Sequence, residues 1–148
     1  SFNAKNNTTV TGMQYKAAEG FTLAFQNGWD KEAYTNGKIW QVATLRPGKY
    51  RLEVTYAYTM VVSDAGNFIS ALMAKGNSES DIPNVADIEQ LNGVCAIYDK
   101  AGINDDSGIL VTPSFEVTET TDVVIGFLTS LAKGNSYFKV TELKLILE

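Results

Sequence analysis

Hydrophobic and polar positions alternate over short runs of this chain, with the period of two that is typical of β-strands half-buried against a core. The pattern is clearest from Gly37 to Met60, where two such runs are joined by Arg46-Pro47-Gly48-Lys49. Proline followed by glycine at the centre of a turn favours type II geometry. We therefore predict a β-hairpin, and the core face of its second strand carries Tyr50, Leu52, Val54, Tyr56, Tyr58 and Met60.

The other strand-like runs are separated by turn signals and cover residues 21–25, 67–74, 94–98, 109–117, 123–127 and 137–147. Pro113 lies inside one of them, and because proline cannot donate to a ladder it is expected at an edge or a bulge. In the last run the apolar parity changes near Thr141-Glu142, which predicts a β-bulge. Val85, Ile88 and Leu91 recur at a spacing of three, which predicts one or two helical turns covering an end of the fold.

These runs together predict an all-β fold, an antiparallel β-sandwich or jelly roll of about eight strands with little helix. A chain of 148 residues fits a single domain. We expect that domain over residues 21–148, preceded by a polar N-terminal arm over residues 1–20. If successive strands are antiparallel, the longer polar and aromatic loops all fall at one end of the sandwich, and the tight Pro47-Gly48 turn falls at the other.

Composition excludes several classes of function. The net charge is −5 and the basic residues are scattered singly, so nucleic acid is not an expected partner. No apolar run approaches the roughly 18 residues of a membrane-spanning helix. Histidine is absent and Cys95 is the only cysteine, which we expect to be a small buried hydrophobe. Without a histidine base, a phosphate loop or a nucleophile motif, the chain is not expected to be an enzyme.

The loops at the predicted functional end combine aromatic rings with carboxylate and amide groups. Such groups stack on the apolar face of a sugar ring and hydrogen-bond its hydroxyls, so they predict glycan binding. The candidate ligand-binding residues are Trp29, Tyr34, Asp99, Asn104, Asp105 and Tyr137.

Two other interpretations of these loops stay open. In the first, Trp29 plugs the end of the sandwich and the loop acids only cap turns. In the second, Asp99, Asn104, Asp105 and Asp106 hold a structural calcium ion through their oxygens. The spacing of these acids does not match the known calcium loop, so we expect no metal or other cofactor to be required.

The predicted hairpin and the C-terminal strand resemble the galactose-binding-like jelly rolls. More narrowly, the chain is similar to the uncharacterised C-terminal domain of surface or periplasmic lipoproteins from Bacteroides-type bacteria. The residues that carry the resemblance are Gly37, Gln41, Leu45, Pro47, Gly48, Tyr50, Tyr137, Lys139, Val140, Leu143 and Leu145.

The resemblance implies a non-catalytic accessory domain of an exported, periplasmic or cell-surface protein. Its partners would be a glycan and the other domains of the same precursor. A structural spacer or protein-interaction domain with no small-molecule ligand is the alternative. The resemblance specifies a fold and carries no binding residues onto this sequence.

Overall fold

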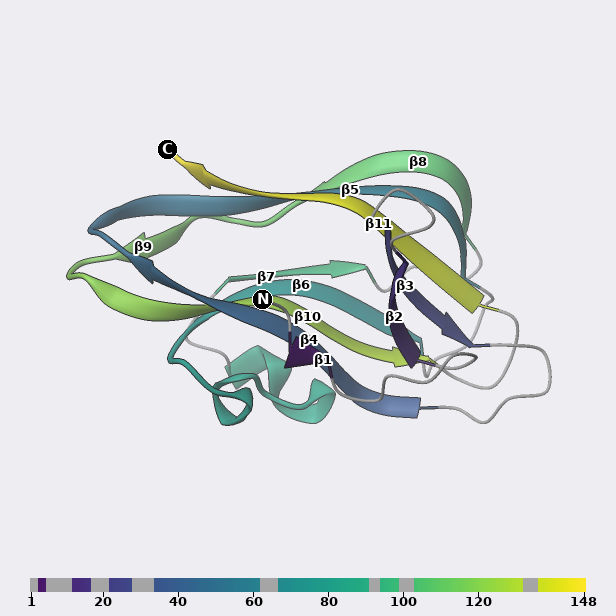
Figure 1. The fold of residues 1–148 in the computed structure, drawn as a ribbon, viewed down its shortest axis with the longest axis horizontal. Helices are drawn as coiled ribbons and strands as arrows, with labels where there is room; N and C mark the ends of the chain where they lie inside the picture. Colours follow the sequence, from purple (N-terminus) through teal and green to yellow (C-terminus); the bar gives the residue numbers. More distant parts are fainter. Residues whose placement is uncertain are drawn as a thin grey trace.

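Two antiparallel β-sheets stacked on one another form the fold (Figure 1). The computed structural model describes residues 3–4, 12–16, 22–27, 34–61, 67–90, 94–98, 103–131 and 136–148. The strands are β1 (Asn3–Ala4), β2 (Gly12–Lys16), β3 (Thr22–Asn27), β4 (Tyr34–Leu45), β5 (Gly48–Val61), β6 (Phe68–Lys75), β7 (Val94–Tyr98), β8 (Ile103–Val111), β9 (Phe115–Val117), β10 (Thr121–Leu131) and β11 (Ser136–Leu147), and two 3-10 segments are η2 (Glu79–Asp81) and η3 (Val85–Gln90). The predicted antiparallel β-sandwich is confirmed, and the described residues contain no α-helix.

The first sheet has the strand order β1-β4-β10-β6-β7. Its central strands β10 and β6 are buried on both faces, which explains why their sequences alternate weakly. The segments η2 and η3 cover the outer face of these two strands (Figure 1). We call this packing the outer cluster, and its buried members are Leu72, Ala74, Ile82, Ile88, Val124 and Leu128. The helical turns predicted around Val85 and Ile88 thus exist as 3-10 helix, but they cover a sheet face instead of an end of the sandwich.

The second sheet has the order β2-β3-β11-β5-β8, and β9 continues beyond β8 along the same side of β5. The bulge predicted near Thr141 is confirmed, because Val140 pairs with Tyr56 and Glu142 with Thr55, which leaves Thr141 unpaired in the ladder. This extra residue lets Val140 and, three positions later, Leu143 both face the core.

A second interruption lies between β8 and β9. Val111 pairs with Glu53 and Phe115 with Tyr50, so three residues of one chain segment oppose two of β5. Pro113 lies in this gap, as its missing N–H predicts. The gap also inverts the side-chain parity: Val111 is exposed in β8, whereas Phe115 is buried in β9.

The predicted hairpin is wrong. β4 belongs to the five-stranded sheet and β5 to the other, so the Arg46-Pro47 connection is a corner that joins the two sheets (Figure 1). Gly48 has a φ of 159°, whereas the third residue of a type II turn has a φ of about 80°. The Tyr50 hydroxyl donates a hydrogen bond of 2.7 Å to the Arg46 carbonyl oxygen and closes the corner. The predicted facing is right, since Tyr50, Leu52 and Val54 are buried.

Residues 1–20, predicted as an arm, supply strands to both sheets. β1 pairs with β4 through Asn3 and Ala4, and β2 pairs with β3 along Gly12–Lys16. Strand pairing of this kind satisfies backbone groups whatever the side chains are, so a polar sequence rich in Asn and Thr does not reveal it.

Between the sheets, the core divides into two clusters along the length of the sandwich. The loop-side core comprises Ile39, Val54, Ile69, Ala71, Phe127, Leu131, Phe138 and Val140. The corner-side core comprises Leu45, Tyr50, Leu52, Met73, Phe115, Val117, Val123 and Ile125. Leu143 packs against both clusters and joins them.

Candidate functional site

Strand ends from both sheets meet at one end of the sandwich, which we call the loop-rich end. The strand pairing shows the convergence: Tyr34 lies opposite Leu131, Ser136 opposite Asn27, and Tyr98 opposite Ile69. In Figure 1 this end is on the right, and the Arg46-Pro47 corner is at the far left. The strand-end residues that define the loop-rich end are Asn27, Tyr34, Val61, Phe68, Tyr98, Ile103, Leu131 and Ser136.

Four of the six predicted site residues have described backbones, and all four lie near this end. Tyr34 begins β4 in the first sheet. Asn104 and Tyr137 lie on either side of Met60, which pairs with both of them across β5. Two strand spacings put their backbones about 10 Å apart. Asp105 follows in β8, opposite Thr59.

Asn104 and Asp105 were predicted in a loop, and this placement is wrong, because β8 begins at Ile103. Their run is polar and does not alternate, yet it pairs with β5 at the edge of the second sheet. Trp29 and Asp99 lie outside the described residues. The backbone of Asp106 is described in β8, but its side chain is not. The described part of the structure therefore brings Asn104, Asp105 and Tyr137 together on one sheet and Tyr34 near them on the other.

Beneath the loop-rich end lies a firmly packed floor. The rings of Tyr56 and Phe138 are 5.1 Å apart between centroids, and Leu131 and Phe138 are both fully buried. Aromatic pairs at this distance stabilise the packing beyond the area that they bury. Such packing holds the strand ends above it in place, which preorganises a site built on them.

Asn36 is a positioning residue that the sequence analysis did not single out. Its φ of 53° lies in the left-handed region, which asparagine tolerates better than most residues. Its backbone N–H donates to the Ser130 hydroxyl at 3.0 Å, and its side-chain oxygen accepts the Val85 N–H at 2.9 Å. Asn36 thus ties the start of β4 to β10 and to η3. The Asn36-Gly37 dipeptide is the turn signal that could have identified it.

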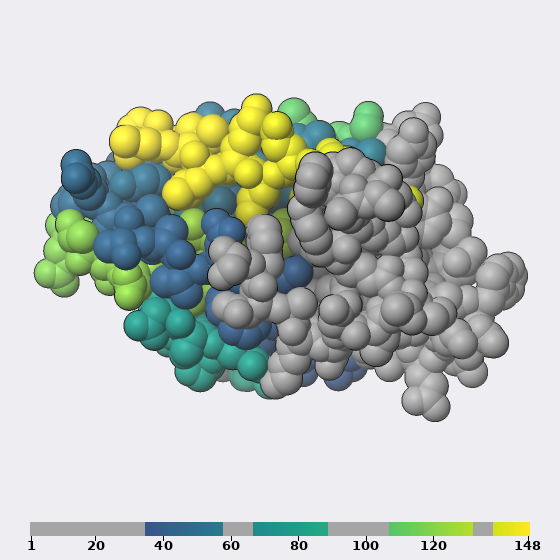
Figure 2. Space-filling model, in the orientation of Figure 1, coloured from purple at the N-terminus to yellow at the C-terminus, as the bar shows by residue number. Residues whose placement is uncertain are grey.

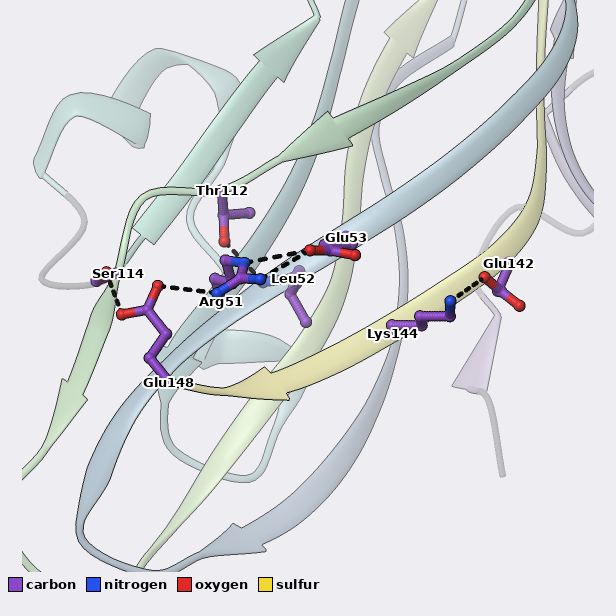
Figure 3. A network of polar contacts seen from close by, with 8 residues as sticks. All are labelled: Arg51, Leu52, Glu53, Thr112, Ser114, Glu142, Lys144 and Glu148. Carbon is purple, nitrogen blue, oxygen red and sulfur yellow. Dashed lines mark hydrogen bonds and ion pairs between the residues drawn. The ribbon is translucent and has the colours of Figure 1, made fainter.

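One network of charged groups lies away from the loop-rich end. Figure 3 shows Arg51 between Glu53 and Glu148, at 3.0 Å and 3.4 Å, on the outer face of the second sheet near the corner. The Ser114 hydroxyl donates to Glu148 at 2.7 Å and, with Arg51, lowers the pKa of that carboxyl. Hydrogen bonds to Glu53 and Glu148 raise the pKa of Arg51. These groups form a partly exposed structural network near the corner.

Within the described part of the chain, no three His, Cys, Asp or Glu side chains gather to hold a metal ion. The calcium alternative concerns Asp99, Asn104, Asp105 and Asp106, whose side chains fall outside that part. The same described residues include no helix long and apolar enough to cross a membrane.

Comparison with solved structures finds chains with which nearly the whole of this chain can be aligned. The carbohydrate-binding module TmCBM61, in complex with β-1,4-galactotriose, is similar with a TM-score of 0.56 and 11% identity, covering 99% of this chain and 88% of that one. A variant of xylanase 10C from Cellvibrio japonicus, in complex with xylopentaose, gives 0.55 and 10% over 99% of this chain. The chain spans 26% of that xylanase. At such identities the similarity shows the fold.

Comparison of the sequence identifies a protein family. No curated protein matches the sequence significantly. Residues 1–126 match the family described as "Domain of unknown function (DUF5013)". The match includes β1 and β2, and every strand of both sheets up to the middle of β10. The chain belongs to the DUF5013 family and has the β-sandwich fold of a carbohydrate-binding module.

Proposed function

We propose that this domain binds a glycan at its loop-rich end and has no catalytic activity of its own. The observation that carries the proposal is the alignment of nearly the whole chain, 99%, with a carbohydrate-binding module. The arrangement of strand ends supports the location, because it gathers aromatic and amide or carboxylate positions from both sheets at one end.

The residue types at this end match the two faces of a sugar. Rings at Trp29, Tyr34 and Tyr137 would stack on the apolar side of a pyranose, and oxygens of Asp99 and Asp105 would accept its hydroxyl hydrogens. Asn104 adds an amide that both donates and accepts. A site with two carboxylates in a chain of net charge −5 repels acidic polysaccharides, so the proposed ligand is a neutral oligosaccharide.

We also infer, from the family resemblance of the sequence, that the domain is an accessory part of an exported protein at the cell surface or in the periplasm. Fractionation of the source cells followed by immunoblotting tests this separately. Recovery of the protein in the cytoplasmic fraction would refute the inferred location and would leave the proposed glycan binding unaffected.

Tryptophan fluorescence offers a sharp test of the binding site, because the chain has two tryptophans. Trp40 is half-buried and packs against the outer cluster, away from the loop-rich end. The Trp40→Phe variant therefore reports on Trp29 alone, and Trp29→Phe reports on Trp40 alone. We expect titration with β-1,4-galacto-oligosaccharides or xylo-oligosaccharides to change the emission of wild type and of Trp40→Phe, and to leave that of Trp29→Phe unchanged.

A glycan array with the intact domain comes first and selects the oligosaccharide. Trp29→Ala and Tyr137→Ala should each weaken binding by about fivefold or more, if stacking contributes about 1–3 kcal/mol as it does for nucleic-acid bases. Glu116→Ala, an exposed change in β9 near the corner, is the matched control and should bind like wild type. Absence of binding to every neutral glycan would reject the proposal in favour of a structural or protein-interaction domain. Unchanged affinity in Trp29→Ala and Tyr137→Ala would show that other residues form the binding site.

A further inference from the structure

We propose that the second half of β11 pairs with the same strand of a second copy of this chain, forming a symmetric antiparallel dimer. The surface concerned, which we call the β11 edge, runs from Thr141 to Glu148. The proposal does not depend on glycan binding.

Among the described strands, none pairs with the outer side of the β11 edge. β3 pairs with β11 only from Ser136 to Val140, and beyond that point β5 is the only described strand beside it. The Glu148 N–H donates to the Lys49 carbonyl, so residues of even number turn their N–H and C=O groups toward β5. The alternation then turns those of Leu143, Leu145 and Leu147 outward. Figure 2 shows β11 in yellow on the surface, and its C-terminal half is left uncovered by other coloured strands.

Apolar side chains lie along the same edge. Leu145 is 37% exposed and Leu147 is 63% exposed, although both share the core-facing parity of the buried Leu52 and Tyr50 with which they pair. They remain exposed because the sandwich is open at this side. A strand with free backbone groups and exposed leucines is a template for pairing with another strand unless charge or proline blocks it. Residues 141–148 contain no proline.

The edge is complementary to itself. In an antiparallel pair with Leu145 of one copy opposite Leu147 of the other, both residues turn their backbone groups toward the second copy, which allows four hydrogen bonds. The exposed leucines of the two copies then cover one another. On the opposite face, Lys144 of each copy lies opposite Glu148 of the other. Glu148 already accepts hydrogen bonds from Arg51 and Ser114, but a carboxylate has about four acceptor sites.

β8 is the competing edge of the second sheet, and it is a poor candidate for self-pairing. Ile109 and Val111 are exposed there too. However, the strand carries Asp105 and Asp106 and has no basic residue, so two copies would bring like charges together. The gap that contains Pro113 also ends the strand. Charge complementarity therefore favours the β11 edge.

A two-fold axis through the paired strands has a geometric consequence. Each β11 begins at the loop-rich end and runs toward the corner, so antiparallel pairing points the two loop-rich ends in opposite directions. A dimer would thus present two separate ends, and it could bridge two ligands.

Sedimentation equilibrium of the full chain, with concentrations up to about 1 mM, tests the dimer directly. We expect wild type to associate reversibly. Lys144→Glu and Glu148→Lys should each weaken association by about tenfold or more, because each places like charges opposite one another. An equimolar mixture of the two variants should recover the dimer, since the mixed dimer keeps one Lys144–Glu148 pair and forms the other with the charges exchanged. Glu116→Lys is the control, because Glu116 is exposed in β9, on the side of β5 away from β11, and it should associate like wild type.

Hydrogen exchange gives a second readout. In the dimer the amides of Leu145 and Leu147 should exchange more slowly as concentration rises, and the amide of Leu143 should not respond. Leu145→Pro removes one outward N–H without removing a bond to β5, and it should abolish this protection. A wild-type protein that stays monomeric over the whole concentration range would overturn the proposal. So would a dimer of unchanged strength in both charge variants.

Discussion

Replacing Thr112 by valine should destabilise the fold through one buried hydrogen bond. Thr112 lies in the gap between β8 and β9, where its hydroxyl oxygen accepts the Leu52 N–H at 2.8 Å, and its own N–H donates to the Leu52 carbonyl at 3.0 Å. Thr112 is 3% exposed and Leu52 is fully buried. Figure 3 shows the two residues side by side. The hydroxyl therefore replaces a ladder bond that the gap has removed.

The loss of unfolding free energy can be estimated from the donor that valine leaves without an acceptor. Valine has the shape of threonine but no acceptor, so the Leu52 N–H stays buried beside the corner-side core without a partner. An unsatisfied buried donor costs about 1–3 kcal/mol. Thr112→Ser keeps the acceptor and loses one buried methyl group, which costs about 0.8 kcal/mol. We therefore expect valine to be the more destabilising of the two substitutions, with a melting temperature lowered by about 3–9 °C.

Urea denaturation followed by tyrosine and tryptophan fluorescence measures these free energies of unfolding for wild type, Thr112→Val and Thr112→Ser. Native-state hydrogen exchange adds a local readout, because the Leu52 amide should lose protection in Thr112→Val alone. A Thr112→Val variant within about 0.5 kcal/mol of wild type, the range of ordinary surface substitutions, would refute this role of the hydroxyl. A lower stability of Thr112→Ser than of Thr112→Val would refute it as well.

Three further changes test other parts of the fold. A Cβ atom added at Gly126 would clash with the Ile39 carbonyl oxygen, so Gly126→Ala should cost about 3 kcal/mol in urea denaturation, and an undiminished midpoint would contradict this. The buried Lys38 ammonium donates a hydrogen bond of 2.7 Å to the Ile82 carbonyl oxygen, between η2 and η3. Lys38→Met should therefore speed proteolysis within residues 79–90. Equal cleavage rates in variant and wild type would show that this hydrogen bond does not hold the segment in place. Hydrogen bonds, the largest of them from the Ser78 backbone, lower the pKa of Asp81 below its usual 3.8 in the folded protein. The ionised carboxylate therefore contributes fully to stability above pH 3.8, and this contribution disappears as the pH falls through the pKa of the folded state. Asp81→Asn should flatten the acid limb of the stability profile, and an identical limb would exclude this contribution.

The sequence predicted which side chains are buried better than it predicted which strands pair. The predicted facing of Tyr50, Leu52 and Val54 and the predicted bulge at Thr141 were correct. Burial of one face of a sheet requires apolar residues at alternate positions, and this pattern is visible in the local sequence. The hairpin was wrong because alternation along two strands does not say whether they share a sheet. The hydrogen bond from Tyr50 to the Arg46 carbonyl shows how a short connection can turn a corner instead.

The end of the sandwich at which the longer loops gather was predictable, and the placement of single residues was less so. Counting antiparallel strands predicted an end at which the longer loops gather, and the strand ends do converge there. Asn104 and Asp105 were misplaced because an edge strand needs only backbone pairing on one side, and its polar residues leave no periodic trace. The 3-10 turns around Ile88 showed their spacing in the sequence, whereas the sheet face that they cover depends on contacts with Leu72 and Val124 that are distant in the chain.

β11 connects the two proposals, and its bulge explains how one strand can serve both. The first half carries Tyr137 at the loop-rich end and buries Phe138 in the loop-side core. Without the extra residue Thr141, the parity of Phe138 and Val140 would continue unchanged, and it would turn the charged side chain of Lys144 inward. The bulge instead turns Lys144 out and keeps the leucines on the core side, where the open edge leaves them exposed. Sequence changes in one half would therefore alter the proposed glycan site, while the other half would keep the proposed pairing surface.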